Sequence, residues 1–517
     1  MEESRTKNVL RNTGIGIFVR LIHLILNFVL KTVFIKVLGI QYTGVSSLFS
    51  DILTILSFAE LGIGSAITYA LYKPVAENDQ RQIVKLMNFY KSAYRMVAVI
   101  VFLSGVLLIP FLGYIVKDVP DIKENLAIIY FLYVVNTTCS YLLIYKSAIL
   151  TAKQKKYEIS RIEGFMAVIR LLLESVILLV FRQFIIYLTT GILLTIIQNI
   201  LIAQRASMEY NVAKKDKNEY LNKEDKKMIF ADIGALAMYQ ISGVVLSGTD
   251  SVIISSILGT ELVGYISYYK MFIGQVTSLL QQFFGAANAS VGNMAVKENR
   301  EKQYQLFKGL NFAVFWIISF CSTCFYILFN PFIELWLGKD YVLEKKIVFV
   351  LVLDFFIANM IRTVALFRTS NGLFIQGKFR PVIMAALNIT LSIVWARKLG
   401  LFGVLMATAV SRLVTQAWYD PWLIYREVFR KNVIEYLTKY SLYMLTTVGG
   451  IAVIEFLTVF INIANLYVMF AIKFLLCVII SNSFVAIFWH RTKDFLMCMN
   501  RLKIIIDMIK RGGKNGR

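Results

Sequence analysis

The 517-residue sequence is poor in charged residues, in proline and in histidine. Charged residues make up 17% and hydrophobic residues 58%, whereas soluble proteins carry about 25% charged residues, so the composition excludes an ordinary soluble domain. Only six prolines are present, which favours long, unbroken helices. The two histidines, His23 and His490, form no HxxxD pattern. This argues against an enzyme such as a membrane glycan polymerase or acyltransferase.

The chain also lacks the motifs of cofactor and metal sites. Of its five cysteines, Cys321 and Cys324 form a CxxC, but this pair lies inside the apolar run FWIISFCSTCFYILF. Without a second pair or a nearby histidine, the spacing does not indicate a zinc or redox site. No nucleotide-binding motif occurs. We therefore expect no metal, no cofactor and no use of ATP.

What the chain does contain is a series of apolar segments, each about as long as the ~20 residues that cross a bilayer. We predict an all-α membrane protein with fourteen transmembrane helices. Their expected ranges are 14–38, 44–72, 89–115, 125–146, 162–181, 184–204, 228–257, 262–290, 305–329, 347–367, 381–396, 401–424, 438–460 and 466–490.

The net charge of +23 is explained by the positive-inside rule rather than by nucleic acid, because most Lys and Arg residues fall in alternate loops. With an even number of spans, both termini are then cytoplasmic. The loops expected outside are small, and the largest, 330–346, is too short to form a domain.

The two halves of the chain resemble each other. The pattern LG, four residues, G, two residues, S occurs at 38–47 and again at 258–267, and the pattern EN followed by Q occurs at 77–82 and again at 298–303. The near-constant offset covers six spans, so the copies are parallel repeats. The predicted organisation is an N-terminal half (1–204, spans one to six), a cytoplasmic linker (205–227), a C-terminal half (228–425, spans seven to twelve), spans thirteen and fourteen (426–490) and a basic cytoplasmic tail (491–517).

The first span carries two cations on one stripe. Its polar residues are spaced 4, 3, 4 and 4 apart, so that they share one face of a helix: Gly16, Arg20, His23, Asn27 and Lys31. A charge in mid-membrane costs at least ~2.5–3.5 kcal/mol. This face therefore has to meet water, a counter-charge or an anionic ligand.

Three other spans carry polar stripes. They are the second (Ser46, Ser50, Ser57, Glu60, Gly64 and Thr68), the seventh (Asp232, Tyr239, Gly243 and Asp250) and the eighth (Ser267, Lys270, Gly274, Ser278, Gln281, Gly285 and Asn288). Small and polar stripes also serve as packing faces between membrane helices. Four such helices facing one another would instead enclose a polar cavity, and its excess of cations would suit a phosphate or pyrophosphate.

Further charges lie within the spans. Arg170 and Glu174, at i and i+4, are expected to form an ion pair. Arg95, Asp354, Arg362 and Arg412 are isolated in the sequence, and some of them lie close enough to the cytoplasmic side to snorkel. Glu455 and Lys473 either pair with each other or mark a groove for a lipid chain. All of these positions are read from the sequence.

Several stretches resemble the bacterial Wzx-type polysaccharide flippases, which belong to the MOP exporter superfamily with the MATE transporters and the lipid II flippases. The likeness covers most of residues 8–425, and the stretches that carry it are KVLGIQYTGVSSLFSDILTILSFAELGIGSAITYALYKPVAENDQRQI, TDSVIISSILGTELVGYISYY, FIELWLGKDY, SNGLFIQGKFRP and LGLFGVLMATAVSR. The resemblance implies two six-helix lobes forming a V-shaped cavity, lined by helices one, two, seven and eight, in the bacterial cytoplasmic membrane. The multidrug branch usually has a carboxylate in the first helix, where this chain has Arg20 and Lys31.

This resemblance implies the flipping of an undecaprenyl-pyrophosphate-linked oligosaccharide by alternating access, with a polysaccharide polymerase and glycosyltransferases as further partners besides membrane lipids. We expect Arg20, Lys31 and Lys270 to bind the pyrophosphate. The expected cavity-lining residues are His23, Asn27, Ser57, Tyr239, Ser278, Gln281 and Asn288, and the candidates for coupling to a proton or sodium gradient or to the membrane potential are Glu60, Asp232 and Asp250. The alternative is an ion-coupled, MATE-like exporter of small molecules.

Overall fold

The protein is described here from a computed structural model that covers all of the chain except residues 1, 61, 118–119, 210–218, 374–375, 462 and 501–517. Inside several helices the backbone is described but the side chains are not, and this set includes Asp232, Tyr239 and Asn288. The described chain is helical throughout and contains no strand, which confirms the prediction of an all-α fold.

Ten helices in the described residues are long and apolar enough to span a membrane: Gly14–Leu38, Gln80–Ile115, Leu126–Ala152, Lys156–Phe181, Phe184–Glu209, Arg300–Trp336, Lys345–Ser370, Arg380–Phe429, Ile434–Val459 and Leu466–Trp489. They confirm a multi-pass membrane protein. Three predicted spans (44–72, 228–257 and 262–290) are absent from this set, and two others (381–396 and 401–424) lie within one helix. The count of fourteen therefore stays a prediction.

The second predicted span is not one helix. Its chain forms α2 (Ile40–Leu56), a 3-10 turn (Ser57–Glu60) and α3 (Ile63–Glu77), with Gly62 in the left-handed region at φ 84°. Glycine adopts this conformation without steric cost. The polar stripe predicted for a continuous helix is therefore split between two shorter ones.

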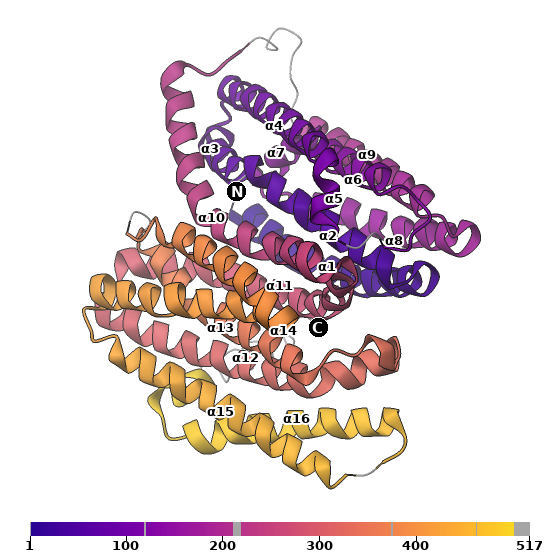
Figure 1. The fold of residues 1–517 in the computed structure, drawn as a ribbon. Helices are drawn as coiled ribbons and strands as arrows, with labels where there is room; N and C mark the ends of the chain where they lie inside the picture. Colours follow the sequence, from indigo (N-terminus) through magenta and orange to yellow (C-terminus); the bar gives the residue numbers. More distant parts are fainter. Residues whose placement is uncertain are drawn as a thin grey trace, which may run out of the picture. The chain divides into compact units, whose positions relative to one another are not determined.

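By its internal contacts the chain divides into two compact units, residues 1–267 and 268–517. The first unit contains α1 (Glu2–Leu38), α2, α3, α4 (Gln80–Leu108), α5 (Leu112–Ile115), α6 (Leu126–Tyr141), α7 (Ser147–Ala152), α8 (Lys156–Phe181), α9 (Phe184–Glu209), α10 (Lys223–Leu258) and the start of α11 (Thr260–Lys297). Within it α1 packs on α8, α8 on α9, and α10 on α2 and α3 (Figure 1). The domain boundaries predicted from the repeat remain a prediction.

The repeat found in the sequence has a local structural counterpart. Gly39 and Gly259 each stand directly before a helix, and both have a positive φ, of 90° and 109°. Five residues later in each copy, Gly44 of α2 and Gly264 of α11 pack against each other's backbones. A Cβ on Gly44 would collide with the carbonyl of Thr260, and one on Gly264 would lie 2.8 Å from the carbonyl oxygen of Ile40. The contact is reciprocal. Gly44 meets Thr260 and Gly264 meets Ile40, and Ile40 and Thr260 occupy equivalent positions in the two copies of the repeat.

The second unit is built around α12 (Arg300–Trp336). The other helices are the remainder of α11, α13 (Lys345–Ser370), α14 (Arg380–Ile424), the π-helical turn Tyr425–Phe429, α15 (Ile434–Val459) and α16 (Leu466–Trp489). α12 packs against α13, α15 and α16 (Figure 1). Aromatic side chains fill this core. The rings of Phe315 and Tyr443 stack with centroids 3.9 Å apart, and burying such rings supplies much of the packing energy of a helical core.

A buried ion cluster fixes the connection between α13 and α14. The Nη1 atom of Arg368 lies 2.5 Å from Oδ1 of Asp420, and Nε of Arg380 lies 3.2 Å from the same oxygen. Arg368 also donates to the backbone carbonyls of Leu373 and Gln376. This cluster ties the loop between α13 and α14 to both helices. Because Arg368 and Asp420 are almost fully buried, water has little access to replace a lost partner.

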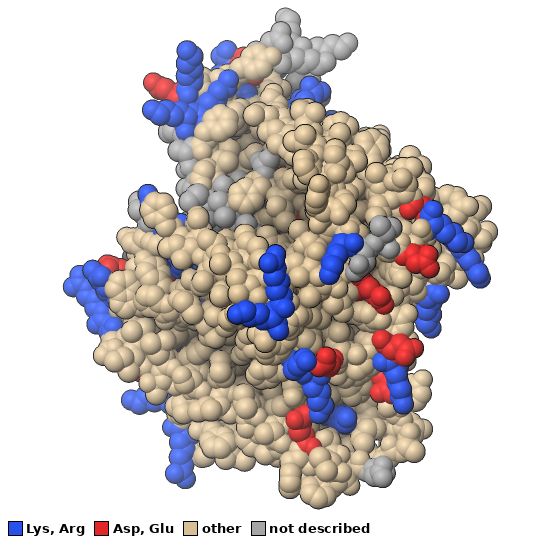
Figure 2. Space-filling view, viewed as in Figure 1, with Lys and Arg blue, Asp and Glu red and all other residues tan. Residues whose placement is uncertain are grey.

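One face of the molecule carries few charged side chains (Figure 2). Figure 2 shows one face on which most residues are neither acidic nor basic, and the Lys, Arg, Asp and Glu side chains stand in separate groups. Large apolar side chains such as Leu107, Phe165 and Val180 are more than half exposed. Exposed apolar surface of this extent is expected where lipid rather than water surrounds a helix bundle.

Candidate functional site

A pocket of about 310 Å³ opens between three helices of the first unit. Its polar lining comes from His23 and Asn27 of α1, Arg170 of α8 and Gln198 of α9, and its apolar lining is Leu26, Leu30, Ala167 and Leu171. The stripe on α1 thus places two of its predicted cavity-lining residues, His23 and Asn27, in one pocket. Sequence periodicity found these two residues but not the arginine and glutamine opposite them.

Arg170 is the strongest charge in this pocket. Its Nη1 atom lies 3.5 Å from Oε1 of Glu174, which confirms the predicted ion pair, and its Nη2 donates to the hydroxyl of Thr195 at 3.1 Å. Glu174 is 2% exposed. Gly191 lies beside the pair, and a Cβ there would be in ordinary van der Waals contact with the Glu174 carboxylate at 3.4 Å. These contacts occupy two of the five N–H donors of a guanidinium, so the same group can serve both the ion pair and the pocket.

Two of the three cations predicted to bind a pyrophosphate, Arg20 and Lys31, lie on α1. Arg20 is exposed, and Lys31 is partly buried with its Nζ 5.5 Å from the ring centroid of Phe34. A cation over an aromatic ring gains ~0.5–2 kcal/mol, which lowers the cost of holding Lys31 between helices. The apolar residues Phe18, Leu21 and Ile25 occupy another, exposed face of the same helix.

Ser57 and Glu60 lie in a different place, among tyrosines of the first unit. Ser57 accepts a hydrogen bond of 2.9 Å from the hydroxyl of Tyr141, and Oε1 of Glu60 accepts one of 2.8 Å from Tyr94. Both bonds bind the 3-10 turn after α2 to neighbouring helices. The structure therefore does not bring these two residues into the pocket with His23 and Asn27.

The predicted acids of α10 are only partly described. Asp250 is buried, at 3% exposure, and its neighbour Ser251 donates a 2.5 Å hydrogen bond to Oδ2 of Asp51 on α2. The sequence analysis did not single out Asp51, although a carboxylate inside a predicted span was itself a signal. Asp232, Tyr239 and Asn288 have no described side chains.

Three further predicted residues belong to α11 in the second unit. Lys270 and Ser278 are partly buried and Gln281 is exposed. Their common stripe on one helix is compatible with a wall of a polar cavity. The roles of Lys270 in pyrophosphate binding and of Ser278 and Gln281 in lining a cavity stay predictions.

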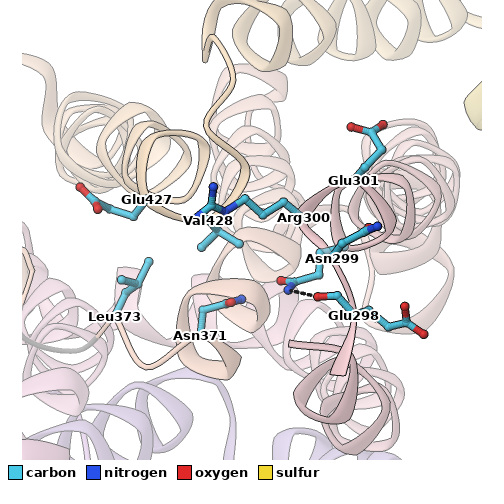
Figure 3. Close-up of a pocket in the computed structure, with 9 residues that line it drawn as sticks. Glu298, Asn299, Arg300, Glu301, Asn371, Leu373, Glu427 and Val428 are labelled. Carbon is cyan, nitrogen blue, oxygen red and sulfur yellow. Dashed lines mark hydrogen bonds between the residues drawn. The ribbon is translucent and has the colours of Figure 1, made fainter. Parts of the chain in front are cut away.

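A second pocket, of about 760 Å³, lies in the second unit at the start of α12. Figure 3 shows Arg300 and Glu301 at this helix start, with Asn371, Leu373, Glu427 and Val428 from other segments. Asn299 caps α12 by accepting from the N–H of Lys302, and Glu298 pairs with the same lysine at 2.8 Å. Glu301 pairs with Lys431 at 3.0 Å. Capping and ion pairing account for Glu298, Asn299 and Glu301. Glu298 and Asn299 are the second copy of the repeated EN pattern.

Glu455 in the thirteenth predicted span has a partner that the sequence could not indicate. Oε1 of Glu455 lies 2.8 Å from Nζ of Lys345 at the start of α13. Glu455 is therefore held by another helix, and the ion pairs of the described residues do not include one between Glu455 and Lys473. The alternative of a lipid groove stays a prediction.

Solved structures of transport proteins share this fold. A structure of the lipid II flippase MurJ in an inward closed conformation matches with a TM-score of 0.66 and 15% identity over 93% of this chain and 99% of that one. An inward-facing MATE family transporter of the MOP superfamily matches with a TM-score of 0.60 and 13% identity, over 77% and 94% of the two chains. The Vibrio cholerae MATE transporter VcmN matches with a TM-score of 0.59 and 14% identity, over 83% and 98%. No protein-family model matches the chain, and no curated protein sequence matches it.

These likenesses establish the fold. The chain has the architecture of the lipid II flippase and of the MATE transporters over most of its length, and the neighbours are transporters rather than enzymes. The finer resemblance to Wzx-type flippases stays an interpretation of the sequence.

Proposed function

We propose that this protein is a flippase that moves an undecaprenyl-pyrophosphate-linked oligosaccharide from the cytoplasmic to the outer leaflet of the bacterial cytoplasmic membrane, with both of its own termini in the cytoplasm. The observation that carries the proposal is the cationic first helix, on which Arg20 and Lys31 share a stripe with His23 and Asn27. Charges are costly in a membrane, and an anionic substrate is the simplest reason to keep two of one sign on a helix.

The pocket of the first unit supports an anionic group of limited size. Its ~310 Å³ equals about ten water volumes, which accommodates a pyrophosphate but not an oligosaccharide. Arg170 is the cation in the lining of this pocket, whereas Arg20 and Lys31 lie outside the lining on the same α1 stripe as His23 and Asn27. A guanidinium recognises phosphate oxygens in pairs. Asn27 and Gln198 can complete the hydrogen bonds, while the sugars stay in the wider cavity expected from the polar stripes.

The spacing of the two cations on α1 suits transfer of the pyrophosphate across the membrane rather than tight binding at one place. Lys31 lies eleven residues beyond Arg20, about 16 Å along the helix axis. One cation in each half of the membrane, with Lys270 as a further contact, would pass the pyrophosphate outward without one deep binding well. The prenyl chain would remain in lipid, and rocking of two lobes would change the side that is open.

The driving force is assigned to an ion gradient or to the membrane potential. Glu60, Asp232 and Asp250 remain the candidate coupling carboxylates, with His23 as a titratable neighbour of the anion path. The polymerase and the glycosyltransferases of the same polysaccharide are the expected partners.

The test uses cells that need this flippase for a surface glycan. Arg20→Ala and Lys31→Ala should each lower glycan export by about tenfold or more, since a hydrogen bond to a charged group contributes ~1.5–3 kcal/mol, while membrane insertion stays normal. Lys36→Ala is the matched control, because Lys36 is an exposed cation on the same helix but lies about 160° from Arg20 around the axis.

If both stripe variants insert normally and flip at the wild-type rate, the anion path is wrong. If the variants change drug resistance and leave the glycan unaffected, the chain is a MATE-like exporter instead.

A further inference from the structure

Two helices of the second unit carry three charged residues deep inside candidate membrane spans. Asp354 and Arg362 belong to α13, and Arg412 belongs to α14, which packs along it. Arg362 lies about 25 Å from the start of α13 and about 12 Å from its end by the helix rise. Arg412 lies twelve residues beyond the kink at Gly400. All three are therefore well away from the ends of their helices.

The three charges do not cancel. Nε of Arg412 lies 2.7 Å from Oδ1 of Asp354. Arg362 instead donates from Nε to the side-chain oxygen of Asn359 at 2.8 Å, and it lies within electrostatic reach of the like charge of Arg412 on the packed helix α14. Within the described residues, no carboxylate lies within 4 Å of the Arg362 guanidinium. The cluster holds two cations and one anion.

Snorkelling does not explain Arg362. Asn359 precedes it by three residues, so the hydrogen bond draws the guanidinium toward the start of α13 and away from the nearer helix end. Asn359 is itself fixed, since it is 1% exposed and donates to the carbonyl of Phe355 at 2.8 Å. The helix thus holds an arginine in place, beside a second arginine, at a depth where a lone charge is costly.

We propose that Arg362 and Arg412 form a binding site for an oxyanion, either a phosphate or a sugar carboxylate. Two guanidiniums on adjacent helices offer enough N–H donors for both oxygens of such a group. Asp354 limits the net charge of the empty site to one, and its carboxylate competes with a bound anion for Arg412. The proposal rests on the proposed flippase function only for the origin of the anion, which would be the lipid phosphate or an acidic sugar of the glycan.

The binding test uses the full-length protein in nanodiscs of phosphatidylcholine, with ligand-induced thermal stabilisation as the readout. Inorganic pyrophosphate represents the lipid phosphate, and digalacturonic acid represents an acidic sugar. At least one probe should stabilise the wild type. Arg362→Gln should bind it about tenfold or more weakly, whereas Asp354→Asn, which removes a competing carboxylate, should bind it at least as tightly. Arg397→Gln is the control, because Arg397 is an exposed arginine of α14 and should bind like the wild type.

A second readout separates a ligand site from a structural role. Without ligand, Arg362→Gln should unfold at the same temperature as the wild type or higher, because it removes an uncompensated cation, and Asp354→Asn should unfold lower. Binding of one probe only would identify the source of the anion. The proposal is overturned if neither probe binds, if Arg362→Gln keeps wild-type affinity, or if it destabilises the empty protein as much as Asp354→Asn. Because purified protein is used, these results do not depend on glycan export.

Discussion

The reciprocal contact between Gly44 and Gly264 predicts that alanine is not tolerated at either position. A Cβ on Gly44 would collide with the backbone carbonyl of Thr260, which cannot rotate away as a side chain would. Overpacking of this kind costs ~1–3 kcal/mol. Alanine also gains ~0.5–1 kcal/mol over glycine in a helix. We therefore expect Gly44→Ala to destabilise the protein by about 1–2 kcal/mol.

The matched control is Gly309→Ala in α12. Gly309 is buried and helical as well, but a Cβ there would meet no atom within 4 Å. This variant keeps the propensity gain without the collision, so it should be neutral or stabilising by up to ~1 kcal/mol. The two glycine-to-alanine changes are chemically identical, and only the neighbouring backbone differs.

The assay is thermal unfolding of purified protein, followed by tryptophan fluorescence or by size exclusion after heating. The double variant Gly44→Ala/Gly264→Ala should lose less stability than the sum of the single variants, because once the helices have moved apart the second methyl meets less resistance. Equal unfolding temperatures for Gly44→Ala and Gly309→Ala would refute the close contact, and additive losses would refute its reciprocity.

Three further outcomes follow from contacts of the described residues. Asp420→Asn should destabilise the second unit by ~3–5 kcal/mol in thermal unfolding, because it leaves the buried Arg368 and the partly buried Arg380 without a carboxylate. No loss of stability would contradict the buried cluster. Tyr141→Phe should cost ~0.5–1.5 kcal/mol by removing the hydrogen bond to Ser57, and the loss should disappear if Ser57 is already alanine. Glu219→Gln breaks the pairs with Arg81 and Lys85 and should lower the free energy of unfolding by less than ~1 kcal/mol. If the variant and the wild type still differ in stability at 1 M salt, these pairs are not surface pairs.

Much about this protein could be derived from the sequence, because hydropathy and helical periodicity depend on neighbouring residues along the chain. The absence of charge over long segments predicts a multi-pass helical membrane protein, and the ten candidate spans confirm it. The repeated LG and EN patterns predict a duplication. Its first glycines, Gly39 and Gly259, both adopt positive φ angles, and its second glycines, Gly44 and Gly264, pack closely. The stripe on the first span predicts that His23 and Asn27 share a helix face, because they are four residues apart, and both line one pocket.

The partners of those residues were decided by the tertiary structure. Periodicity tells which face of a helix is polar but not which helix faces it, so the pocket that joins His23 to Arg170 could not be derived from either span alone. The same holds for Glu455, which pairs with Lys345 more than a hundred residues away, and for Arg362, which has an asparagine and a second arginine beside it instead of an acid. An ion pair depends on distances between helices, and only packing sets those distances.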